Sequence, residues 1–101
     1  MHIARIYLPL SDNDGKRFAE WNFAAVEEEL SRRFGGVTSH MESPATGLWR
    51  QADKMHQDDI VIFEVILEHP DRDWWRAYRK HLEREFRQLR ILIMLQQIEL
   101  I

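Results

Sequence analysis

The chain has 101 residues, 45% of them hydrophobic and 31% charged, and this balance predicts one soluble globular domain over residues 1–101. It contains no cysteine, which excludes disulfides, thiolate metal ligands and a cysteine nucleophile. No window approaches the roughly 18 consecutive apolar residues of a membrane span, and the amino terminus lacks a secretory pattern, so we expect no membrane association and a cytoplasmic location. The formal net charge of -3 makes general nucleic-acid binding unfavourable.

The first part of the chain predicts a strand, a helix and a second strand. Residues 3–8 alternate, with Ala4, Ile6 and Leu8 on one face and Ile3, Arg5 and Tyr7 on the other. Residues 9–15 are turn formers, and a helix is expected from about residue 16 to 34. Its apolar stripe has steps of three and four residues: Ala19, Phe23, Val26, Leu30 and Phe34. Gly35-Gly36 ends the helix, and a strand over 37–42 follows.

The second part predicts a strand, a helix and a last strand. Residues 43–47 break the second strand, a short piece follows around Trp49, and the polar stretch 51–58 is expected to be a loop. The run 60–67 is apolar on both faces except for Glu64. Asp71 can cap a helix whose stripe is Trp75, Tyr78, Leu82, Phe86 and Leu89, and a strand from residue 91 to about 100 closes the chain.

The order β-α-β-β-α-β predicts an α+β, ferredoxin-like sandwich, in which two helices lie on one face of a four-stranded antiparallel sheet. The run 60–67 would turn Val61, Phe63, Val65 and Leu67 toward the helices. Its other row, Ile60, Ile62 and Ile66, would lie on the open face with Glu64. The last strand is also apolar on both faces, with Ile91, Ile93 and Leu95 in one row and Leu92 and Met94 in the other. Because such an exposed apolar sheet would promote aggregation, we expect a homodimer that packs the two open faces together, with Ile60, Ile62 and Ile66 in the interface. Cover by residues 43–58 is the alternative.

Four polar side chains are candidates for a site on the open face. Strand alternation places Arg5, Tyr7, His40 and Glu64 there, and the first and third strands are neighbours in this fold. A histidine beside a carboxylate could act as a general base, with Tyr7 and Arg5 orienting a substrate. The interpretation we favour is a cross-strand pair of Arg5 and Glu64 that compensates a buried charge, with His40 as an edge residue.

Aromatic residues form a second candidate ligand surface. Phe18, Trp21 and Ala25 lie on the first helix opposite its main stripe. The segment that carries Leu48, Trp49 and Met55 could fold back over them, which is the interpretation we favour. Otherwise they form an exposed patch or the wall of a ligand pocket, for which the candidates are Trp21, Trp49 and Arg50.

Metal chemistry has little support in the sequence. The string 12–15 is similar to part of a calcium loop, but Trp21 stands where the bidentate glutamate belongs, so a turn and helix cap is expected. The five histidines lack metal-ligand spacing. We therefore predict no metal and no cofactor.

The second helix is basic. Residues 71–90 contain seven basic and four acidic side chains, and Arg79, Glu83 and Arg87 stand at the four-residue spacing of helical ion pairs. A solvated face is the expected interpretation, and an anion-binding face is the alternative.

Several short motifs resemble a group of small bacterial proteins of about this size that has no assigned activity. They are Ile6-Tyr7-Leu8-Pro9, Phe34-Gly35-Gly36-Val37-Thr38, Pro44 with Gly47-Leu48-Trp49, Asp58-Asp59 before a strand, and Trp74-Trp75 before a basic helix. The resemblance covers nearly the whole chain, implies a compact bacterial domain and carries over no catalytic residue. The pattern is also similar to the dimeric α+β barrel superfamily, which includes small monooxygenases, haem-degrading enzymes and ligand-sensing domains.

Three functional hypotheses follow. The leading one is a homo-oligomeric domain that binds a small molecule or a protein partner without catalysis. The second is a cofactor-independent enzyme with an acid/base site on the open sheet face, and the third is anion or nucleic-acid binding through the arginine-rich second helix.

Overall fold

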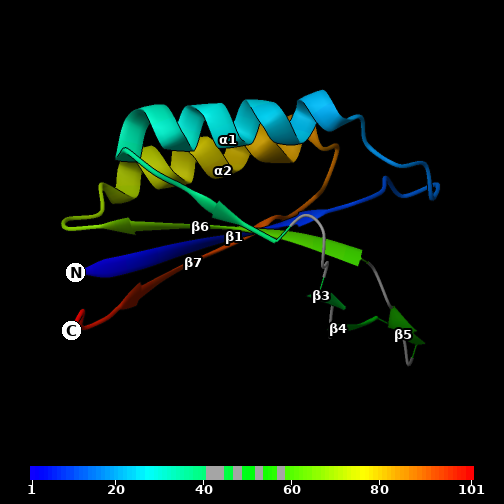
Figure 1. The fold of residues 1–101 in the computed structure, drawn as a ribbon. Coiled ribbons are helices and arrows are strands. Elements are labelled where there is room, and N and C mark those ends of the chain that lie inside the picture. Colours follow the sequence, from blue (N-terminus) through cyan, green and yellow to red (C-terminus); the bar gives the residue numbers. More distant parts are fainter. Residues whose placement is uncertain (41–44, 47–48, 52–53, 57–58) are drawn as a thin grey trace.

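The computed structural model describes residues 1–40, 45–46, 49–51, 54–56 and 59–101. Its main sheet has the order β2-β6-β1-β7, formed by β2 (Thr38–Ser39), β6 (Asp59–Leu67), β1 (His2–Pro9) and β7 (Leu92–Gln97), and all neighbours are antiparallel. A short strand, β3 (Ala45–Thr46), pairs with the beginning of β6. The helices α1 (Glu20–Phe34) and α2 (Arg72–Glu85) both cover one face of the sheet (Figure 1). This arrangement confirms the predicted ferredoxin-like α+β fold.

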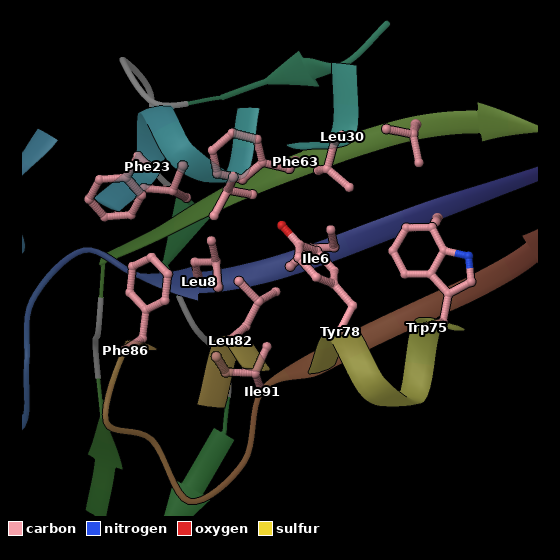
Figure 2. Close-up of a cluster of buried hydrophobic side chains, with 14 of the residues drawn as sticks. Ile6, Leu8, Phe23, Leu30, Phe63, Trp75, Tyr78, Leu82, Phe86 and Ile91 are labelled. Atoms are coloured by element: carbon pink, nitrogen blue, oxygen red, sulfur yellow. The ribbon is translucent and has the colours of Figure 1, made fainter. Parts of the chain in front are cut away.

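The hydrophobic core lies between the sheet and the two helices. The predicted inward rows of β1 and β6 are confirmed, since their side chains are at most 8% exposed: Ala4, Ile6, Leu8, Val61, Phe63, Val65 and Leu67. The helices contribute larger groups, and Figure 2 shows Phe23 and Leu30 of α1 and Tyr78 and Leu82 of α2 gathered over the strands in one cluster. Burial of these side chains, at roughly 25 cal/mol per Å² of apolar surface, is the main force that holds the helices on this face.

The end of α1 and the start of α2 follow local sequence signals. Gly35 follows α1 with φ 81° and donates its backbone N–H to the carbonyl oxygen of Ser31, the left-handed cap that glycine favours. Asp71 precedes α2, and its Oδ1 accepts a hydrogen bond from the backbone N–H of Trp74 at 3.1 Å. The predicted C-terminal end of the first helix and the predicted start of the second helix are therefore confirmed.

The start of α1 differs from the prediction. The helix begins at Glu20, because a turn at residues 13–15, where Asp12 Oδ1 accepts from the backbone N–H groups of Asp14 and Lys16, sends the chain back along residues 10–11. Arg17 forms a β-bridge with Ser11, and Phe18 donates its backbone N–H to the carbonyl oxygen of Leu10. Phe18, predicted on the outer helix face, is only 7% exposed and packs edge to face on Phe86 at 5.0 Å. The turn expected at residues 12–15 is thus present, and it folds Phe18 into the core.

The end of α2 also differs. Phe86 is buried as predicted, but Arg87 has φ 49°, so the chain leaves the helix before Leu89, which is fully exposed. The polar stretch expected to be a loop contains β5 (Lys54–His56), which pairs with β4 (Trp49–Gln51) in a separate two-stranded sheet. Residues 41–44, 47–48, 52–53 and 57–58 of the predicted strand end, breaker and loop lie outside the described part of the chain.

Candidate functional site

The sheet face opposite the helices carries three rows of side chains. In register, Tyr7 lies across from Ile62 and Leu92, and Arg5 lies across from Glu64 and Met94. The third row consists of Ile3, Ile66 and Gln96. Several apolar members are open to solvent, with exposures of 43% for Ile66, 52% for Leu92 and 40% for Met94.

A polar cluster, called the Glu64 cluster here, is centred on the middle row and extends into the rows on either side: Arg5, His40, Glu64 and Gln96. Glu64 Oε2 accepts from Arg5 Nε at 3.1 Å, and Oε1 lies 2.6 Å from His40 Nε2. Arg5 Nη1 also donates to Gln96 Oε1 at 3.0 Å. The predicted cross-strand pair and the predicted histidine–carboxylate contact therefore occur together on one carboxylate.

Glu64 is held in its charged form. Its side chain is 21% exposed, so burial alone would raise its pKa. The hydrogen bond with His40 opposes this effect most strongly, the Arg5 guanidinium adds to it, and the net result is a lowered pKa for Glu64. A carboxylate that stays ionised between two basic groups can accept hydrogen bonds, but it is poorly suited to donating a proton.

A hollow of about 470 Å³ lies next to the cluster. It is formed where the α1–β2 connection leaves the edge of β6, and it is lined by Phe34, Gly35, Gly36, Val37, Thr38, Glu64, Val65 and Ile66. Thr38 pairs with Glu64 across the β2–β6 ladder, so the hollow is lined by the residue whose carboxylate contacts Arg5 and His40. An apolar group could therefore lie beside the polar cluster.

The structure brings together three of the four predicted polar residues. Tyr7 is half-buried in the neighbouring row and makes no hydrogen bond to the cluster among the described residues. Gln96 is the member that the sequence interpretation missed. A signal for it existed, because it continues the outward row of Leu92 and Met94 on the strand that borders β1.

The predicted aromatic ligand residues do not converge. Trp21 is 67% exposed and lines a groove of about 420 Å³ between the helices, together with Trp74 and Tyr78. Trp49 and Arg50 lie in β4, and the β4–β5 hairpin is on the other side of the main sheet from the helices (Figure 1). The prediction that this segment covers Trp21 is therefore wrong. The side chains of Trp49 and Arg50 lie outside the described part.

The predicted interface residues differ in accessibility. Ile60 is only 4% exposed within the single chain, so it has little surface left for a partner, whereas Ile62 is half-buried and Ile66 is exposed. Within the described ranges, no cluster of three or more histidine or acidic side chains could hold a metal ion. No helix in that part of the chain has the length and hydropathy needed to cross a membrane.

Comparison with known proteins gives a fold but no family. No protein-family model matches the chain, and no curated protein matches it. One similar solved structure is a phage SAM lyase in complex with S-methyl-5'-thioadenosine, with a TM-score of 0.61 and 14% sequence identity. The match covers 95% of this chain and 80% of that chain. At this identity the likeness supports the α+β fold alone.

Proposed function

We propose that this chain forms a cytoplasmic homodimer that binds a small molecule on the open sheet face, at the Glu64 cluster. The observation that carries the proposal is the composition of this face: a charge-compensated polar cluster lies among the exposed apolar side chains of Ile66, Leu92 and Met94 and beside a hollow of about 470 Å³. Apolar surface with a few convergent polar groups is the usual composition of a ligand site.

The second copy is needed because of the exposed apolar rows. Ile66, Leu92 and Met94 would remain in contact with water in a monomer, and an apolar sheet face of this kind invites association. Packing two such faces together would also bury the Glu64 cluster. A buried carboxylate is tolerated when it is paired and hydrogen-bonded, as Glu64 is by Arg5 and His40.

The first ligands to test are adenosyl thioethers and their SAM precursor. The support for this class is the likeness of fold to the SAM lyase with bound S-methyl-5'-thioadenosine, and the chemistry of the cluster agrees with it. Glu64 can accept hydrogen bonds from ribose hydroxyls, Gln96 offers an amide, and the apolar rows can cover a flat base.

The experiment is a calorimetric titration of S-methyl-5'-thioadenosine and of SAM into the wild type and two variants. Glu64→Gln removes the charge of the cluster, and we expect at least tenfold weaker binding, because each hydrogen bond to a charged group contributes about 1.5–3 kcal/mol. Glu68→Gln is the matched control, an equal charge change at an exposed position just after β6, and it should bind like the wild type. Equal affinity of both variants, or no heat from either ligand, would contradict the proposal.

Catalysis at the same cluster is the second candidate. The observation that favours it is the 2.6 Å contact between His40 Nε2 and Glu64, which can orient the imidazole as a general base. An enzyme should consume SAM in a chromatographic assay, and His40→Gln should abolish turnover while the protein remains folded. A binding domain would leave SAM intact.

A further inference from the structure

A further crevice lies on the helix side of the sheet, between α2 and the edge strand β7. Its volume is about 250 Å³, and it is lined by Arg72, Trp75, Arg76, Arg79, Ile93 and Leu95. Ile93 and Leu95 point to the helix side of the sheet and are only partly buried, because β7 is the outermost strand. This α2–β7 crevice therefore has an apolar floor and is separate from the Glu64 cluster.

The helical repeat places three guanidinium groups along this crevice. Arg72, Arg76 and Arg79 are spaced by four and three residues, so they project from one face of α2. No acidic residue is among those that line the crevice in the described part of the chain. Its lining thus carries three positive charges and no compensating negative one.

The ion pairs that these arginines make within the chain are weak, so a bound anion could replace them. Arg76 contacts Asp73 at 3.1 Å, but the Asp73 side chain is 97% exposed, and such surface pairs are weak. Arg79 stands 3.9 Å from Glu83, whose Oε2 already accepts from the backbone N–H of Ile91 at 3.0 Å. Arg72 has no ion pair among the described residues, so an incoming anion would meet little competition.

Trp75 gives an independent indication of a missing partner. Trp75 is 4% exposed, its ring packs on the sheet (Figure 2), and its indole N–H donates to no acceptor within the described residues. A buried donor without an acceptor is unfavourable and uncommon in folded proteins. Trp75 is also one of the residues that line the crevice, so a ligand bound there would lie beside this unpaired donor.

We propose that the α2–β7 crevice binds a small phosphomonoester whose flat apolar body lies against the partly buried Ile93 and Leu95, beside Trp75. A phosphate dianion matches the fork of donors that guanidinium groups present, and several arginines can share its three oxygens. The apolar floor selects an organic phosphate over inorganic phosphate. This site is independent of the proposed function of the Glu64 cluster, so either can fail alone.

The test is an NMR titration with phenyl phosphate that follows the indole N–H signal of Trp75, assigned by its loss in Trp75→Phe. We expect a saturable shift of this signal and of the backbone signals of Ile93 and Leu95. Benzylammonium has a similar ring and the opposite charge, and it should cause no shift. Inorganic phosphate should bind at least tenfold more weakly than phenyl phosphate, and equal binding would overturn the assignment of an organic ligand.

Two double variants distinguish a specific binding site in the crevice from nonspecific attraction of the anion to the positive charge of α2. Arg72→Gln with Arg79→Gln should weaken phenyl phosphate binding at least tenfold. The matched control, Arg84→Gln with Arg90→Gln, removes the same charge from positions outside the crevice and should stay within threefold of the wild type. Equal weakening by both pairs, or an unmoved Trp75 signal, would overturn the proposal. So would tighter binding of a single-stranded oligonucleotide with a steep loss on added salt, which would indicate a nucleic-acid surface instead.

Discussion

Glu64 holds two basic side chains from different parts of the sheet at once. Arg5 comes from β1 and His40 follows β2, so the carboxylate joins three neighbouring segments across the open face. Each oxygen has its own partner, an arrangement that stabilises a partly buried charge better than a single contact. The cluster should therefore contribute to stability as well as to binding.

The pH dependence of stability tests this contribution. At neutral pH we expect Glu64→Gln to lower the free energy of unfolding by about 1–2 kcal/mol, because charge-assisted hydrogen bonds are lost. Since the pKa of Glu64 is lowered in the folded state, its contribution is complete above the ordinary value of 4.5 and is lost as the pH falls through the folded-state value. Urea unfolding of wild type and variant across this range should show the two curves converging in acid.

Glu68→Gln serves as the control, because its exposed side chain should give nearly the wild-type curve at every pH. A difference between wild type and Glu64→Gln that persists undiminished to about pH 2 would show that the loss is not due to ionisation of Glu64.

At the scale of elements, α2 depends on its cap. Asp71 Oδ1 accepts from the Trp74 N–H, and this contact fixes the first turn that carries Trp74 and Trp75 against the core. We expect Asp71→Ala to lower the free energy of unfolding by about 1 kcal/mol, the typical cost of losing an N-cap. Thermal unfolding measures the change.

Asp73→Ala is the matched control, since it removes an equally charged side chain from the same turn. Asp73 is 97% exposed and contacts only Arg76 in the described structure, so its removal should cost a few tenths of a kcal/mol. Equal destabilisation by both variants would mean that the helix dipole, rather than the cap hydrogen bond, is responsible.

Elements with a strong repeat could be predicted from the sequence, and their ends could be predicted only where a local signal exists. The stripe from Trp75 to Phe86 and the cap at Gly35 gave α2 and the end of α1 correctly. Leu89 continued the same spacing, but the positive φ of Arg87 turns the chain away, and nothing in an arginine signals that conformation. The predicted start of α1 was wrong because the Asp12 side chain accepts hydrogen bonds from Asp14 and Lys16 in the preceding turn and does not cap the helix.

For the whole molecule, the topology followed from the order of elements, while the site followed only in part. Strand alternation and the central place of β1 and β6 are enough to bring Arg5 and Glu64 together. Strand alternation puts Gln96 on the same face as Leu92 and Met94, but its position next to Arg5 required the register of β7 against β1, which the sequence does not fix. The place of Trp49 and Arg50 required the path of the β4–β5 hairpin, and no periodic pattern specifies that path.

The dimer is the claim on which the binding proposal depends, and mutation of its apolar rows tests it. Ile62 is half-buried and lies in the row of Tyr7 and Leu92, so a charge at this position would face the partner in a packed dimer. Ile62→Glu should separate the two copies while the helix-side core stays intact. Leu89→Glu adds the same charge at a fully exposed position outside the sheet and should leave the assembly unchanged.

Sedimentation equilibrium of the wild type and these two variants is the most direct measurement. We expect the wild type and Leu89→Glu to sediment at twice the 12.2 kDa of one chain, and Ile62→Glu to sediment as a folded monomer. A wild type that is monomeric at every concentration, with the same mass as Ile62→Glu, would contradict the account.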